Sequence, residues 1–134
     1  NNNKVRKAAN DWDFSERGRE RQAKRMTDIA EKYRQEGRYD YLVTDYICPT
    51  PKTREIFKAD YLVWVDTIDK GRFDDTNKMF VKPKKYDFRV TSKNAEFFAH
   101  QIVNGKLYNK ISKTPYSDFL KYCIIEVEVF VTSL

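Results

Sequence analysis

Glycine is scarce in this chain, with four residues among 134, at positions 18, 37, 71 and 105. Their number and spacing exclude a collagen repeat and a complete glycine-rich phosphate loop, GxxxxGK[ST], within these residues. Long apolar runs are also missing. The longest candidates, residues 61–65 and 123–131, have the length of strands, and Glu126 and Glu128 interrupt the second. A membrane-spanning helix needs roughly 20 apolar residues, so none is expected.

Histidine and cysteine are rare as well. His100 is the single histidine, so neither a Ser-His-Asp triad nor a multi-histidine metal site is expected, and a structural role is the simpler interpretation. The two cysteines, Cys48 and Cys123, form neither a CxxC pair nor a zinc-binding pattern. Isolated cysteines without a secretory signal are typical of a reducing compartment, so a cytoplasmic protein is expected.

Charged residues, in contrast, are abundant. They make up 34% of the chain, with a net charge of +6 and an isoelectric point near 9.2. A basic protein favours an anionic partner such as a nucleic acid, a nucleotide, a sulfate or phosphate ester, or an acidic surface. Hydrophobic residues amount to 40% and aromatic residues to 15%, which is enough for the core of one domain.

Hydrophobic patterning predicts alternating helices and strands. Ala23, Met26, Ala30 and Tyr33 lie three and four residues apart and form one apolar stripe. With Ser15 as N-cap and Gly37 as terminator, this stripe predicts a helix over residues 15–37. Strands are expected over residues 40–47, 61–65 and 86–90, with helices over 51–58 and from Ser92 or Asn94 to Val103. This order predicts an α/β fold with a parallel sheet.

Two segments lack a regular place in this scheme. Residues 69–86 have no clean period and are expected to form a long loop or lid. Residues 1–104 would then form one unit, and residues 105–134 a tail of unknown assignment. In that tail, residues 123–131 alternate between β-branched and other residues and predict a half-exposed strand.

Three features point to a site where the strands end, because ligands of parallel α/β sheets bind at that edge. Asp45 follows four mostly apolar residues, a Walker-B-like pattern that suits a magnesium-binding acid. Arg19 and Gln22 extend the apolar stripe of the long helix, and Arg19 could bind a phosphate or sulfate bidentately. Arg72 and Lys78 surround Phe73 in the lid segment. Each feature also has a plain alternative: a solvated carboxylate, a charged helix surface and an ordinary loop.

Together these motifs resemble adenylylsulfate kinase over residues 3–91. This family transfers the γ-phosphoryl group of ATP to the 3′-hydroxyl of adenosine 5′-phosphosulfate in sulfate activation. The stretch Asn1-Asn2-Asn3-Lys4-Val5-Arg6 occupies the place of the family's Asp-Gly-Asp-Asn-Val-Arg motif. Phe14-Ser15, Arg19 and Gln22 match its Phe-Ser…Arg-x-x-Asn element, and residues 45–49 match its Ser-Phe-Ile-Ser-Pro strand end. Asp74-Asp75 and Pro83 resemble its lid.

The resemblance implies a role for each matching residue. Arg6, Arg19 and Gln22 would hold the phosphosulfate and ribose, Ile47 would line the substrate site, and Phe14 with Phe73 would sandwich the adenine. Arg72 and Lys78 would be lid cations. Asp45 would support catalysis by binding magnesium, directly or through water. ATP and Mg²⁺ are the cofactors expected for the complete enzyme.

The resemblance also implies that something is missing. The family's first strand, its Walker A loop and its first helix would all precede Asn1. The chain is therefore expected to be a partial P-loop kinase-like sheet with flanking helices, inactive alone and left with unpaired strand edges. A missing N-terminal segment or a second copy of the chain would be its protein partner.

Two other functions stay open from the sequence. A non-catalytic module could keep the acceptor half of such a kinase and bind a nucleotide without turnover. A basic nucleic-acid-binding domain could use the helix over residues 15–37, although acidic residues interleave with its basic ones.

Overall fold

The computed structural model describes residues 1–39, 41–107 and 123–128. The described helices are α1 (Asn2–Ala9), α2 (Glu16–Glu36), α3 (Pro51–Phe57), α4 (Asp74–Met79), α5 (Ala95–Ile102) and the π-helical turn η1 (Val103–Leu107). The described strands are β1 (Leu42–Asp45), β2 (Tyr61–Val65), β3 (Phe88–Val90) and β4 (Cys123–Glu128). The predicted α/β class is confirmed.

The four strands form one parallel sheet in the order β1-β4-β2-β3. Strand β4 lies between β1 and β2, so Ile125 is in register with Thr44 on one side and Leu62 on the other. The expectation of unpaired strand edges is therefore wrong for the neighbouring edges of β1 and β2, because β4 pairs with both strands. The predicted strand over residues 123–131 is seen as β4, and residues 129–131 lie outside the described residues.

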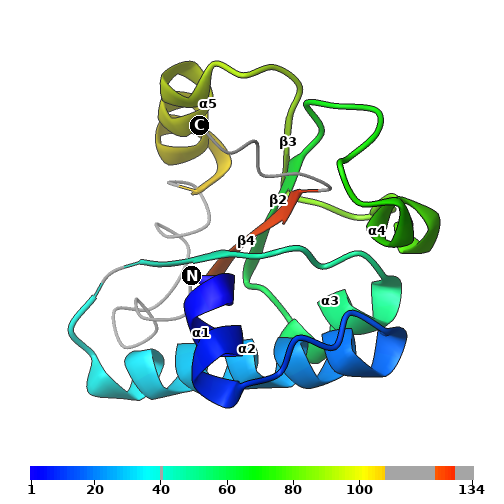
Figure 1. The fold of residues 1–134 in the computed structure, drawn as a ribbon. Helices are drawn as coiled ribbons and strands as arrows, with labels where there is room; N and C mark the ends of the chain where they lie inside the picture. Colours follow the sequence, from blue (N-terminus) through cyan, green and yellow to red (C-terminus); the bar gives the residue numbers. More distant parts are fainter. Residues whose placement is uncertain (40, 108–122, 129–134) are drawn as a thin grey trace.

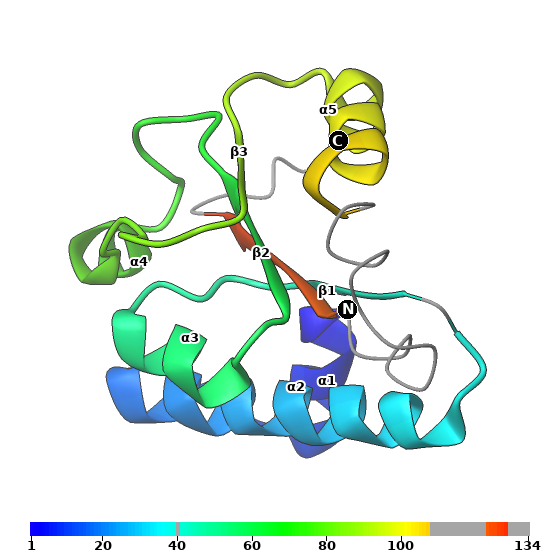
Figure 2. The same ribbon diagram turned by 180° about the vertical axis from the view of Figure 1, so that it is seen from behind.

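Helices α2 and α3 lie side by side on one side of the sheet, while α5 lies on the other (Figures 1 and 2). Helix α2 begins where Ser15 Oγ accepts a hydrogen bond from the Gly18 amide at 3.2 Å, and it ends at Gly37, whose φ is 65°. Both ends match the prediction. Helix α3 begins with a capping box between Thr50 and Thr53.

The main core lies between α2 and the sheet. Its buried residues are Ala23, Met26, Ala30, Tyr46, Cys48, Phe57 and Trp64. The first three are the apolar stripe that predicts the helix. Tyr33, the fourth member of that stripe, is 41% exposed, because α2 extends past the sheet at its C-terminal end. The stripe therefore overstates how far the helix is buried.

Two helices were not expected. Helix α1 begins with Asn1, whose side chain accepts a hydrogen bond from the Asn3 amide at 3.0 Å. Helix α4 lies inside the segment predicted as a loop or lid. It has six residues, too few to show a period, although Asp74 and Asp75 in its first turn favour a helix start. No described helix is long and apolar enough to cross a membrane.

Candidate functional site

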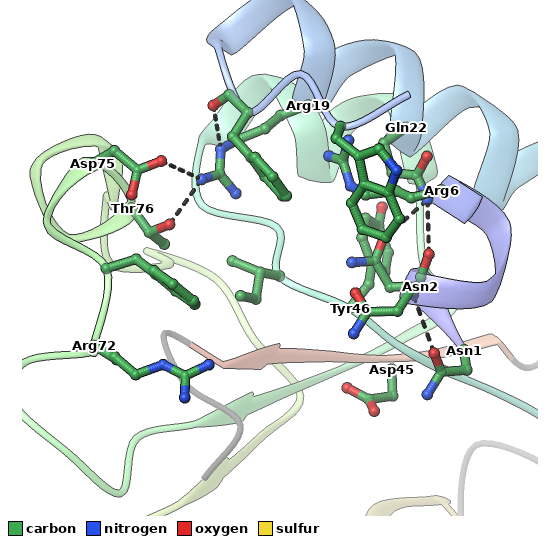
Figure 3. Close-up of a pocket in the computed structure, with 15 residues that line it drawn as sticks. Asn1, Asn2, Arg6, Arg19, Gln22, Asp45, Tyr46, Arg72, Asp75 and Thr76 are labelled. Atoms are coloured by element: carbon green, nitrogen blue, oxygen red, sulfur yellow. Dashed lines mark hydrogen bonds and ion pairs between the residues drawn. The ribbon is translucent and has the colours of Figure 1, made fainter. Parts of the chain in front are cut away.

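A cavity of about 540 Å³ opens at the carboxyl end of β1 (Figure 3). This volume is in the range of sites for small molecules. Its walls come from α1, the loop before α2, the first turns of α2, the end of β1 and the start of α4. The lining residues are Asn1, Asn2, Asn3, Arg6, Trp12, Phe14, Arg19, Gln22, Asp45, Tyr46, Ile47, Arg72, Phe73, Asp75 and Thr76.

Most of the predicted site residues meet in this cavity. The lining includes the predicted residues Arg6, Phe14, Arg19, Gln22, Asp45, Ile47, Arg72 and Phe73. Lys78 is the exception: it lies on α4, is exposed and does not line the cavity. The geometry thus gathers residues that are up to 67 positions apart in the chain, from Arg6 to Phe73.

Arg19 joins α2 to the segment around α4. Its side chain is only 6% exposed. Nε donates to the Phe14 carbonyl at 2.9 Å, and Nη2 donates to Thr76 Oγ1 at 2.7 Å and to Asp75 Oδ2 at 3.4 Å (Figure 3). Nη1 has no hydrogen-bond partner among the described residues. The protein therefore holds the guanidinium through Nε and Nη2.

Arg6 is a second buried cation in the same wall. It is 2% exposed, and its Nη1 donates to the carbonyls of Asp11 and Asp13 at 3.0 and 3.1 Å. Its Nε is buried and has no hydrogen-bond partner among the described residues. Burial lowers the pKa of the Arg6 guanidinium, and the like charge of Arg19 lowers it further. A guanidinium nevertheless stays charged at neutral pH, so an anion bound here would relieve the repulsion.

Phe14 supports both cations. The guanidinium carbon of Arg6 lies 4.6 Å from the centroid of the Phe14 ring, and that of Arg19 lies 5.5 Å from it. Both distances are in the range of cation–π contacts. Phe14 thus contacts both arginines, and it remains 43% exposed.

Gln22 fixes the wall opposite α4. Its side chain is fully buried and its Nε2 donates to Asn2 Oδ1 at 2.9 Å, while its Oε1 accepts from Arg25 at 3.1 Å. The amide therefore ties α1 to α2 (Figure 3). In this arrangement Gln22 positions α1, and both Gln22 and Asn2 line the cavity.

The lid side of the cavity is held by its own contacts. The Arg72 guanidinium carbon lies 4.8 Å from the Phe73 ring centroid. Asn77 closes the turn before α4, because its side chain accepts from the Gly71 amide and donates to the Gly71 carbonyl, both at 2.8 Å. Together with the bonds from Arg19, these contacts place Phe73 and Arg72 over the end of β1.

Asp45 lies at the last position of β1, half-buried and facing the cavity (Figure 3). Among the described residues there is no group of three or more acidic, histidine or cysteine side chains that could hold a metal ion. A single carboxylate still suits Mg²⁺, because this ion is commonly held by one or two carboxylates, water and substrate phosphates.

Two other candidate residues lie outside the site. Cys48 is buried, and this burial raises the pKa of its thiol to about 11, which leaves it unreactive at neutral pH. His100 lies exposed on α5 and does not line the cavity.

Sequence reasoning missed Gly18, Trp12 and Thr76. A Cβ at Gly18 would lie 2.2 Å from the Asp13 carbonyl oxygen, so only glycine allows the loop before α2 to pack this closely. Its place in the first turn of a helix, where glycine is unfavourable, was the available signal. Trp12 is an exposed tryptophan in the cavity wall. Nothing local reveals Thr76, which is buried by tertiary contacts.

No family model, curated protein or solved structure matched the chain when it was compared with them. The case for a function therefore rests on the geometry of the cavity and on the resemblance carried by its residues.

Proposed function

We propose that the cavity binds adenosine 5′-phosphosulfate as the phosphoryl acceptor of an adenylylsulfate kinase-like enzyme. The observation that carries this proposal is the meeting of eight of the predicted residues in one cavity at the end of β1. A cavity with two buried guanidinium groups and aromatic walls suits a ligand that has both an anionic group and a flat ring.

Arg6 and Arg19 are the proposed anion-binding residues. Each keeps donor groups that no described residue uses, and each is fixed by hydrogen bonds that limit the ordering cost of binding. Arg72 adds a third cation at the lid side. Asp45 is the proposed acid for Mg²⁺, which in the complete enzyme would neutralise the transferred phosphoryl group of ATP.

Transfer itself needs more than this cavity. The 134 residues contain no GxxxxGK[ST] sequence, and that loop cradles the β- and γ-phosphates in P-loop kinases. We therefore propose binding of the acceptor for these residues, and turnover for a protein that also supplies the loop. If binding occurs without turnover in such a protein, the non-catalytic module is the better description.

The nucleic-acid alternative is disfavoured by the charges of α2. Four of its arginines form ion pairs with carboxylates, and these are Arg19, Arg21, Arg25 and Arg34. A helix that bound a phosphate backbone would need such groups facing outward and free of carboxylates. The pairing leaves α2 a less continuous basic surface than its composition suggests.

Equilibrium titration by calorimetry tests the proposal. Adenosine 5′-phosphosulfate should bind saturably and more tightly than AMP, because the sulfate adds an anionic group near the arginines. Arg72→Ala should weaken binding without disturbing the fold, since Arg72 is exposed. Arg19→Ala should weaken it by roughly 10- to 150-fold, the loss of a hydrogen bond to a charged group.

The matched control is Arg34→Ala. Arg34 lies on the same helix and pairs with Asp60 outside the cavity, so its loss should leave affinity unchanged. Binding of a single-stranded oligonucleotide tests the alternative that the chain is a nucleic-acid-binding domain. Tight, steeply salt-dependent binding of the oligonucleotide, together with no saturable binding of adenosine 5′-phosphosulfate, would replace the kinase proposal with the nucleic-acid one.

A further inference from the structure

Four aromatic residues line the cavity, and three of them already contact neighbouring side chains. Phe14 carries the guanidinium groups of Arg6 and Arg19, at 4.6 and 5.5 Å from its ring centroid. Phe73 carries that of Arg72 at 4.8 Å. The third of these rings is Tyr46, which is 3% exposed and packs against Phe57 with 5.5 Å between ring centroids.

Trp12 differs from these three rings. It is 51% exposed, lines the cavity, and makes no cation–π contact, ring contact or side-chain hydrogen bond with any described residue. Exposing half of an indole to water forgoes the burial that so large an apolar side chain normally gains. An open aromatic face in a cavity wall is a surface on which a flat ligand can stack.

The backbone that carries Trp12 is fixed on both sides. The carbonyls of Asp11 and Asp13 accept hydrogen bonds from Arg6, and the Asp13 amide donates to Asp11 Oδ1 at 3.1 Å. The Asp11 carboxylate also accepts from Arg25 at 2.6 Å. Trp12 is therefore presented by an ordered loop directly beside the buried Arg6, which lowers the ordering cost of stacking a ligand on it.

We propose that Trp12, and not Phe14, is the stacking residue for the base of the bound nucleotide. The proposal rests on the proposed function for the identity of the ligand and extends it by assigning the ring-binding residue. Phe14 is then a positioning residue, whose ring faces Arg6 and Arg19. The ligand class is a flat heterocycle with an anionic group, with the ring on Trp12 and the anion near the guanidinium groups of Arg6 and Arg19.

The chain offers a direct optical readout, because its only other tryptophan is Trp64, which is 6% exposed and outside the cavity. In Trp64→Phe, adenosine 5′-phosphosulfate should quench the fluorescence saturably, while ribose 5-phosphate, which lacks the base, should not. If Trp64→Phe does not fold, the difference between the wild-type chain and Trp12→Phe gives the same signal.

Affinities provide the second readout. Trp12→Ala should lose roughly 5- to 150-fold in affinity for adenosine 5′-phosphosulfate, the range for one base stacked on an aromatic side chain. Trp12→Phe should recover most of it, and affinity for inorganic pyrophosphate should stay unchanged in both variants. Phe97→Ala is the matched control, because Phe97 is 52% exposed and lies on α5 outside the cavity.

The outcomes separate the two proposals. If adenosine 5′-phosphosulfate binds equally well to Trp12→Ala and to the wild-type chain, the stacking role is overturned while the proposed function stands. If it does not bind, but another nucleotide quenches Trp12 saturably, the stacking role stands and the choice of substrate fails. The stacking role is wrong if no nucleotide changes Trp12 fluorescence and none binds more weakly to Trp12→Ala than to the wild-type chain.

Discussion

Replacing Gly18 by alanine tests whether the loop before α2 is held as closely as the cavity requires. Helix propensity alone predicts a gain of about 1 kcal/mol for this change. The structure predicts the opposite sign. The new Cβ would lie 2.2 Å from the Asp13 carbonyl oxygen and 2.5 Å from its Cγ, where real contacts essentially never fall below 3.0 Å. The backbone of the loop must therefore move by about 0.8 Å.

The net cost can be bounded from these two effects. Overpacking of this kind costs about 1–3 kcal/mol. After the propensity gain of about 1 kcal/mol is subtracted, we expect Gly18→Ala to be destabilised by up to about 2 kcal/mol. Affinity for the nucleotide should also fall, because the displaced Asp13 carbonyl is a hydrogen-bond acceptor of Arg6.

Urea unfolding followed by circular dichroism measures the free energy of unfolding. Gly105→Ala is the control, since a Cβ at Gly105 meets nothing within 4 Å, and its effect should stay within about 0.5 kcal/mol. A Gly18→Ala chain that is more stable than the wild type by about 1 kcal/mol, the gain that helix propensity alone predicts, would refute the close packing of the loop on α2.

Three further predictions concern single groups. Asp75→Asn should tighten binding of an anionic nucleotide by roughly two- to fivefold, seen by calorimetry, because the Asp75 carboxylate competes for Arg19; weaker binding would contradict this. Hydrogen bonds lower the pKa of Asp13 to about 2, and those from Ser15 have the largest effect. Its stabilising contribution should therefore be complete above the unfolded pKa near 3.9 and be lost as the pH falls toward 2. In the wild-type chain the urea midpoint should fall as the pH is lowered over this range, and in Asp13→Asn it should fall less. An equal fall in both chains would contradict the lowered pKa of Asp13. In Cys123→Ser, Cys48 should react with iodoacetamide at pH 8 only on unfolding, since burial raises its thiol pKa to about 11; rapid alkylation of the folded chain would show that it is accessible.

The elements that the sequence predicts well are those with strong local signals. Helix α2 has a capping serine, an apolar stripe and a terminal glycine, and the strand over residues 61–65 is a continuous apolar run. Helices α1 and α4 have eight and six residues, too few for periodicity to show. Helices α3 and α5 are as short, but their start signals, Pro51 and Asn94, predict them. The interior place of β4 depends on pairing between distant segments, to which no local pattern points.

The site follows the same division. The rule that ligands bind where parallel strands end places Asp45, and the resemblance supplies the arginines and aromatic residues around it. The partners of Arg19 could not be predicted, because Asp75 and Thr76 lie 56 and 57 residues away in sequence. Lys78 shares the lid segment with Arg72, but helix α4 carries it away from the lining.

The most direct test of the account is to map where adenosine 5′-phosphosulfate binds, by amide chemical-shift changes in the isotopically labelled chain. The account predicts saturable changes concentrated in the cavity walls, at residues 1–6, 12–22, 45–47 and 72–76. Changes on the outward face of α2 or on α5, with none in these walls, would contradict it. So would a folded chain that shows no saturable change at all.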